Sequence, residues 1–285
     1  MKRILSGNEA IARGAWEAGV HLAAAYPGTP STEILEELSR FPLVYCEWST
    51  NEKVAVDVAV GAAYAGRRAL AAMKHVGVNV AADSFFYVSF TGTEAGLVIV
   101  SADDPAMHSS QNEQDNRRFA QFARVPCLDP ADSQECKDFT ILGFELSERF
   151  DGPIMLRTTT RINHSATPVE LGERVEVAPR HEKFPRNPEK YVMVPAHARK
   201  RHPFVEQRTL DVASWAEKAS INRIEWRDRK VGIITAGIAY QYAREVFPSA
   251  SILKLGLVYP VPGQLVRTFA AGVERLVIME ELDPV

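Results

Sequence analysis

One carboxylate at the start of a predicted helix is the first candidate for chemistry in this sequence. Glu52 follows a strand-like segment at 43–48 and lies in the first turn of a helix predicted over 50–65. A helix gives such a carboxylate a fixed position from which it can bind a ligand or transfer a proton. Spacing alone favours a simpler role, because Glu52 stands three residues after Ser49, as in a capping box.

Two polar loops after predicted strands are further candidates for a ligand site. The loop at 26–33 has Gly28, which allows close backbone approach, and Thr29, which offers a hydroxyl at a helix start. An ordinary turn with a helix cap also explains this loop. The loop at 103–118 is almost entirely polar, which is typical of a surface loop or of a ligand site. Four of its side chains are pocket candidates: Ser109, Ser110, Gln111 and Asn112.

Lys74 and His75 directly follow a predicted strand at 68–74 and could belong to the same site, although the pair alone fits a strand end better. His75 and His108 lack partners at the spacing that zinc needs, and no nucleophile elbow, dinucleotide-binding motif or P-loop occurs. The three cysteines are too few and too scattered for a disulfide framework or an iron–sulfur cluster. Hydrolase, P-loop and metal-site assignments therefore find no support.

The elements that must position these residues alternate between helices and short β-rich runs. Strands are expected at 20–27, 43–48, 68–74, 96–103, 125–128 and 153–160, and helices at 6–18, 50–65, 79–90, 112–123 and 132–149. Ser6 and Glu9 have capping-box spacing at the first helix. The alternation predicts an α/β fold with a doubly wound, mainly parallel sheet over residues 1–165. Ligands bind such sheets at the carboxyl ends of the strands, where the candidate segments lie.

The rest of the chain divides into a connector and a second unit. Residues 166–229 are expected to form an ordered connector or a crossing arm, because 166–209 holds six prolines, many charges and little periodicity. Residues 230–285 predict a smaller strand–helix–strand–helix–strand unit that stops just past a strand. We therefore expect an incomplete unit, from a truncated polypeptide or one finished by another chain.

Composition excludes several broad classes. A formal net charge of −3 spread along 285 residues gives no field for nucleic acid or an anionic membrane surface. No apolar run approaches the length of a membrane-spanning helix or a signal peptide. We expect a cytoplasmic protein that contacts neither membrane nor nucleic acid.

Seven segments, in order and correctly spaced, carry a family resemblance: YPGTPSTEI, EWSTNEKVAVDVAVGAAYAGRRALAAMKHVGVNVAAD, LVIVSADDPAMHSSQNEQDNR, RTTTRINHS, GIITAGIAYQY, LKLGLVYPVP and VIMEELDP. Together they resemble the N-terminal part of the alpha subunit of indolepyruvate:ferredoxin oxidoreductases, which are thiamine-diphosphate-dependent 2-oxoacid:ferredoxin oxidoreductases. The resemblance covers nearly the whole chain apart from the connector.

This resemblance implies that residues 1–165 are a pyrimidine-binding domain and that 230–285 begin a domain like the transketolase C-terminal domain. It makes Glu52 the acid that hydrogen-bonds N1′ of the aminopyrimidine and so activates thiamine diphosphate. An apolar wall of Val54, Val58 and Ala62 would strengthen that bond. Gly28 and Thr29 would contact the cofactor. Thr29 would also lie near the substrate carboxylate, in a pocket that includes Lys74, His75, Ser109, Ser110, Gln111 and Asn112.

The resemblance also implies partners. The chain lacks the G-D-G motif that holds Mg²⁺ and the cysteine runs that hold iron–sulfur clusters in the parent enzyme. A diphosphate-binding domain, a beta subunit, ferredoxin, coenzyme A and a second copy of the chain are therefore expected. The implied reaction is oxidative decarboxylation of an indolepyruvate-like 2-oxoacid to an acyl-CoA, which this chain alone would not complete. The alternative is a non-catalytic structural or regulatory subunit with the same fold.

Overall fold

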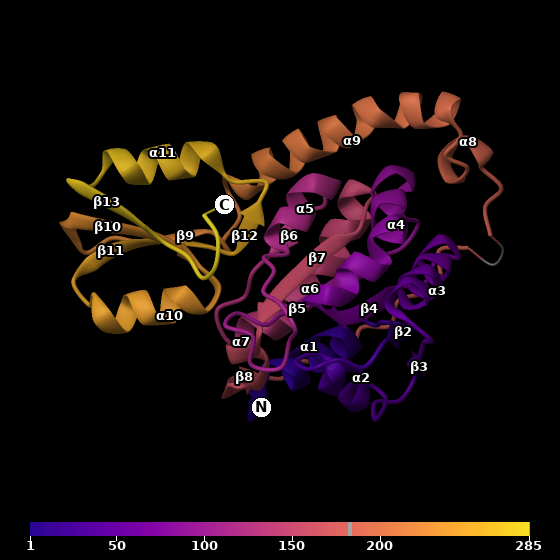
Figure 1. The fold of residues 1–285 in the computed structure, drawn as a ribbon, viewed down its shortest axis with the longest axis horizontal. Helices are drawn as coiled ribbons and strands as arrows, with labels where there is room; N and C mark the ends of the chain where they lie inside the picture. The colour runs from indigo at the N-terminus through magenta and orange to yellow at the C-terminus, as the bar shows by residue number, and fades with distance from the viewer. Residues whose placement is uncertain (182–183, 285) are drawn as a thin grey trace.

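A seven-stranded sheet forms the centre of the larger of two α/β units in the computed structural model, which describes residues 1–181 and 184–284 (Figure 1). The strand order is β12-β6-β7-β5-β4-β2-β3, and only β12 is antiparallel to its neighbour. The strands are β2 (Leu22–Ala25), β3 (Tyr45–Trp48), β4 (Ala69–Lys74), β5 (Leu97–Asp103), β6 (Cys127–Leu128), β7 (Ile154–Thr159) and β12 (Leu257–Tyr259). The predicted doubly wound, mainly parallel sheet is confirmed.

Helices cover both faces of this sheet. One face carries α1 (Gly7–Glu17), α2 (Thr32–Leu38) and α6 (Ser133–Phe150), and the other carries α3 (Glu52–Tyr64), α4 (His75–Thr91) and α5 (Arg117–Ala123). Each face has its own apolar core, around Ile11 and Phe144 on one side and Val56 and Phe85 on the other. Strands buried on both faces need apolar side chains in both directions, which explains runs such as Leu97–Val100.

Two predicted helix starts were misplaced. The helix expected at 79–90 begins at His75, because α4 follows β4 without a loop and its N-cap, Lys74, makes no side-chain capping bond that the sequence could signal. The helix expected at 112–123 begins at Arg117, because hydrogen bonds hold 104–116 as a loop. The capping box at α1 is confirmed, since Ser6 and Glu9 exchange both hydrogen bonds.

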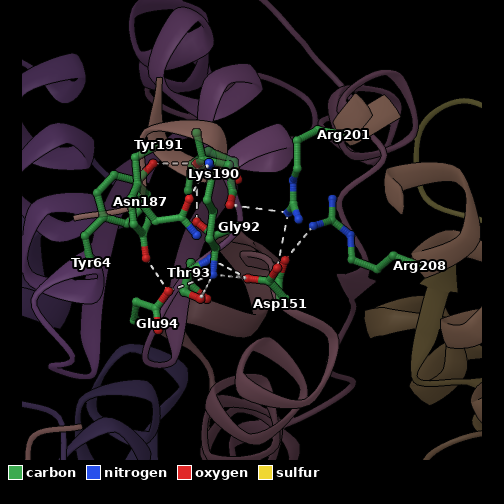
Figure 2. A network of polar contacts seen from close by, with 12 residues as sticks. Tyr64, Gly92, Thr93, Glu94, Asp151, Asn187, Lys190, Tyr191, Arg201 and Arg208 are labelled. Atoms are coloured by element: carbon green, nitrogen blue, oxygen red, sulfur yellow. Dashed lines mark hydrogen bonds and ion pairs between the residues drawn. The ribbon is translucent and has the colours of Figure 1, made fainter. Parts of the chain in front are cut away.

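The segment after β7 is more regular than its sequence suggests. It contains α7 (Thr160–His164), β8 (Ala166–Glu170), which pairs with β1 (Lys2–Ser6), α8 (Pro188–Tyr191) and the 22-residue α9 (Pro195–Ala216). The inward side of α9 includes Arg201 and Arg208, which donate to the backbone oxygens of Phe90 and Ser89. Figure 2 shows both arginines reaching toward Asp151. A helix that packs through arginines has little hydrophobic periodicity, so the sequence did not predict it.

The smaller unit has a four-stranded sheet in the order β13-β10-β11-β9. Its strands are β9 (Arg223–Glu225), β10 (Asp228–Ala236), β11 (Ala250–Leu255) and β13 (Arg275–Met279), with α10 (Gly237–Val246) and α11 (Gly263–Ala271) on opposite faces (Figure 1). β12 leaves this unit and pairs with β6, so the two units share hydrogen bonds. No helix within the described ranges is long and apolar enough to cross a membrane.

Candidate active site

The predicted site residues come together because they follow four neighbouring parallel strands. β5, β4, β2 and β3 are adjacent in the sheet, and the segments 104–116, 74–77, 26–31 and 49–52 leave their carboxyl ends. Parallel strands place all these segments at one edge of the sheet, as the sequence predicted.

Glu52 is the first residue of α3, but it does not cap the helix. Asn51 is the N-cap, and its Oδ1 accepts from the backbone N of Val54 at 3.0 Å. The expected cap, Ser49, has a buried hydroxyl with no hydrogen-bond partner among the described residues. The prediction of a capping box at Ser49 was therefore wrong, since a box would place Glu52 at the third helical position and not the first.

Glu52 is largely buried, and its carboxylate is unpaired among the described residues. The residue is 9% exposed, and within the described part of the chain its carboxylate makes no hydrogen bond or ion pair. Buried carboxylates are normally paired, so this one has capacity for a ligand. The expected wall of Val54, Val58 and Ala62 was wrong: Val54 is 37% exposed, and the buried face of α3 that includes Glu52 carries Ala55, Val56 and Ala59.

Gly77 brings the first turn of α4 against Glu52. A Cβ atom at Gly77 would lie 2.6 Å from Cγ and 2.7 Å from Oε1 of Glu52, closer than carbon can approach. Only glycine therefore leaves the carboxylate in its observed place. The sequence analysis missed Gly77, although a glycine three residues after a strand end was a usable signal.

Gly28, Thr29, Lys74 and Ser109 form a second cluster at this edge. A Cβ atom at Gly28 would lie 3.0 Å from Cδ of Lys74, so the lysine stem lies directly over the glycine. Lys74 Nζ is 3.4 Å from the backbone oxygen of Ser109, and Ser109 Oγ is 3.3 Å from the backbone oxygen of Thr29. Three segments distant in sequence thus meet around one ammonium group.

The remaining candidates face the protein or the solvent. His75 is fully buried, and its Nε2 is 3.1 Å from the backbone oxygen of Asn112, while Nδ1 has no partner among the described residues. Ser110 donates its hydroxyl to Asp104 at 2.8 Å. The side chains of Gln111 and Asn112 are exposed. The structure therefore gives His75 and Ser110 contacts that hold the loop.

Asp104, which the sequence analysis did not single out, organises that loop. Its carboxylate accepts from the backbone N of Ser109 at 2.8 Å and from the hydroxyl of Thr160 at 2.7 Å. Burial raises the pKa of the Asp104 carboxyl, but the hydrogen bonds from Ser109, Thr160 and Ser110 outweigh burial and hold the pKa well below its ordinary value. Ala106 and Met107 lie between Asp104 and Ser109 and have φ of 64° and 53°. This is a left-handed conformation that non-glycine residues rarely adopt.

A buried ionic cluster joins this loop to the smaller unit. Arg117 is 3.0 Å from the backbone oxygen of Glu281 and 2.9 Å from the Glu280 carboxylate, and it also binds Asp115. A cavity of 190 Å³ lies beside Arg117, lined mainly by apolar residues of the smaller unit. None of the nine predicted site residues, all of which the structure describes, lines this cavity. No group of three or more metal-ligating side chains occurs in the described ranges.

Comparisons with known proteins identify the family. Residues 13–232 match the family model described as "Pyruvate flavodoxin/ferredoxin oxidoreductase, thiamine diP-bdg". The chain is 45% identical to the indolepyruvate oxidoreductase subunit IorA of Archaeoglobus fulgidus, over 99% of this chain and 47% of that protein. It is 47% identical to the subunit of the same name from Thermococcus kodakarensis, over 99% and 46%. The chain thus spans about half the length of these curated relatives.

A solved structure supports the same fold. The 2-oxoglutarate:ferredoxin oxidoreductase of Magnetococcus marinus, determined with 2-oxoglutarate, coenzyme A and succinyl-CoA bound, aligns with a TM-score of 0.77 at 17% identity. The alignment covers 97% of this chain and 57% of that one. The family model and the relatives carry the assignment, and the chain belongs to the pyruvate flavodoxin/ferredoxin oxidoreductase family through its thiamine-diphosphate-binding domain.

Proposed function

We propose that this chain supplies the pyrimidine half of a thiamine-diphosphate site in an enzyme that oxidatively decarboxylates indolepyruvate-like 2-oxoacids to acyl-CoA, with ferredoxin as electron acceptor. The observation that carries the proposal is the buried, unpaired carboxylate of Glu52, held against Gly77 at the start of α3. Thiamine diphosphate supplies a carbon acid at thiazolium C2 that adds to 2-oxo groups when it is bound and activated.

The residues present suit the aminopyrimidine part of this cofactor. Glu52 offers one hydrogen-bonding carboxylate, Gly77 allows that carboxylate to keep its position, and the buried hydroxyl of Ser49, nearby in sequence, has no partner among the described residues. In this proposal Glu52 shares a proton with the ring nitrogen N1′. Gly28 and Thr29 line the substrate side of the cofactor.

The rest of the site and reaction come from partners. We propose that a diphosphate-binding domain, in the same parent chain or another subunit, holds Mg²⁺, and that iron–sulfur clusters elsewhere in the assembly take electrons to ferredoxin. A beta subunit, coenzyme A and a second copy of this chain complete the assembly, which we place in the cytoplasm. We propose that residues 1–165 and 230–285 belong to two domains joined by 166–229, with β12 of the second range adding a strand to the sheet of the first.

Turnover of the assembled oxidoreductase tests this function. Glu52→Gln keeps the size of the side chain but removes its acid, so the rate of 2-oxoacid-dependent ferredoxin reduction should fall by about 100-fold or more. Glu36→Gln changes an exposed glutamate on α2 and should leave the rate unchanged. Wild-type turnover in the Glu52→Gln enzyme would instead favour a non-catalytic subunit.

A further inference from the structure

Lys74 is a cation without a counter-ion at the candidate site. Its side chain is half-buried at the carboxyl end of β4. Its one hydrogen bond is a long one of 3.4 Å to the backbone oxygen of Ser109, and no carboxylate among the described residues lies within 4.0 Å of Nζ. An ammonium has three donors, so most of its capacity is unused.

Other lysines withdrawn from solvent in this chain are paired. Lys137 contacts Glu17 at 3.1 Å, Lys190 contacts Glu94 at 2.8 Å, and Lys254 contacts Glu135. Taking an ammonium out of water costs free energy unless an anion compensates it. Lys74 differs from these lysines, because its stem is half-buried while its contact with Ser109 is exposed to solvent. Its ammonium is therefore open, at the edge of the sheet where ligands bind, to an anion from outside the described chain.

The surroundings of Lys74 hold it in place. Its stem lies over Gly28, where a side chain would collide with Cδ, and the Ser109 oxygen touches its tip. Ser109 is itself fixed by Asp104 across a turn with two successive left-handed non-glycine residues, Ala106 and Met107. Such conformations are unfavourable for non-glycine residues and persist where the surroundings impose them. The fold therefore maintains a costly turn that presents Ser109 to Lys74 and Thr29.

We propose that Lys74 binds the carboxylate of the 2-oxoacid substrate, an inference that rests on the proposed function above. The carboxylate of Glu52 and the ammonium of Lys74 lie in different clusters of the same edge, so one can bind the cofactor while the other orients the substrate. One ammonium matches one carboxylate.

Steady-state kinetics of the assembled oxidoreductase tests the proposal. Lys74→Met should raise KM for an aryl 2-oxoacid by about 10- to 100-fold, the effect of losing one charge-assisted hydrogen bond, and should change kcat less. Lys74→Arg should recover part of the loss. The inhibition constant of an aryl acetate, which keeps the carboxylate but cannot react, should rise in parallel. Lys53→Met removes a half-buried lysine that is paired with Asp83, and it should change neither constant.

The outcomes separate this inference from the proposed function. Unchanged KM and inhibition constant in both Lys74→Met and Lys74→Gln would overturn the assignment of Lys74, as would a loss of thiamine diphosphate affinity that accounts for the whole defect. Glu52→Gln should lower kcat without changing aryl acetate binding. If Glu52→Gln keeps full turnover, the proposed function fails, while the aryl acetate constants still decide whether Lys74 binds a carboxylate.

Discussion

Asn51 and Glu52 are adjacent at the start of α3, but only Asn51 caps the helix. Asn51 extends its side chain back to cap Val54, which satisfies a free helix N–H group. Glu52 therefore does not cap the helix, and its carboxylate makes no hydrogen bond or ion pair with the described residues. The sequence had indicated a capping box of Ser49 and Glu52, which would have occupied this carboxylate. The neighbouring asparagine caps the helix instead.

Replacing Gly77 tests whether this glycine allows the Glu52 carboxylate to keep its position. Gly77→Ala should lower turnover by about 100-fold, because the new Cβ displaces the Glu52 carboxylate and small misplacements of a reacting group cost rates of this order. Thermal unfolding and turnover should be measured together. Glycine-to-alanine changes inside helices ordinarily stabilise a protein by about 0.5–1 kcal/mol. A loss of turnover without a loss of stability would therefore show that the Glu52 carboxylate is displaced.

Gly61→Ala is the matched control for that prediction. It lies on the exposed side of α3, and a Cβ there meets nothing within 4 Å. It should raise stability slightly and leave turnover unchanged. If Gly77→Ala behaves like Gly61→Ala, contact between the two helix starts does not position Glu52.

Among the elements, α8 and α9 are held to the larger unit by charges. Glu94 contacts Lys190, Tyr191 and His181, while Asp151 contacts Lys190 and Arg201 (Figure 2). Burial raises the pKa of the Glu94 carboxyl, but hydrogen bonds from Lys190, Tyr191 and His181 outweigh burial and lower the pKa to about 2. Protonating Glu94 therefore weakens the contacts that hold His181 and α8 against the larger unit.

This network predicts a defined pH dependence of stability. A carboxylate whose pKa is lowered by folding contributes stability that is present above its unfolded pKa of 4.5 and is lost as the pH falls toward 2. The free energy of unfolding should therefore fall more steeply between these pH values in the wild type than in Glu94→Gln. Denaturant titrations at several pH values measure this difference. Equal slopes would show that the Glu94 contacts contribute nothing.

The elements also show what the sequence could and could not predict. The alternation of apolar strands with helices predicted the parallel sheet. The rule that ligands bind at the carboxyl ends of parallel strands placed Gly28, Glu52 and Lys74 at one edge. The helix α9 was missed because arginines replace the expected apolar stripe. The partners of His75 and Ser110 depend on how the 104–116 loop folds back, which no local pattern encodes.

At the scale of the whole molecule, Arg117 joins the site loop to the smaller unit. Its side chain is 3% exposed and lies between Asp115 and Glu280. Arg117→Met would remove the cation that pairs with the buried carboxylate of Asp115, so we expect a loss of about 3–5 kcal/mol in the free energy of unfolding. Calorimetry of the Arg117→Met variant should also show separate unfolding transitions for the larger and the smaller unit. Arg118→Met, at an exposed neighbour, should change stability little, and an equal effect of both variants would argue against Arg117 as the link.

The chain as a whole presents the Glu52 carboxylate and the Lys74 ammonium at one edge of a parallel sheet. It spans about half the length of its curated relatives. The most direct test of the central claim measures hydrogen–deuterium exchange at C2 of thiamine diphosphate bound to the assembled oxidoreductase. We expect Glu52→Gln to slow this exchange by about 100-fold or more while Glu36→Gln leaves it unchanged. Exchange at the wild-type rate in Glu52→Gln would contradict the claim that Glu52 activates the cofactor.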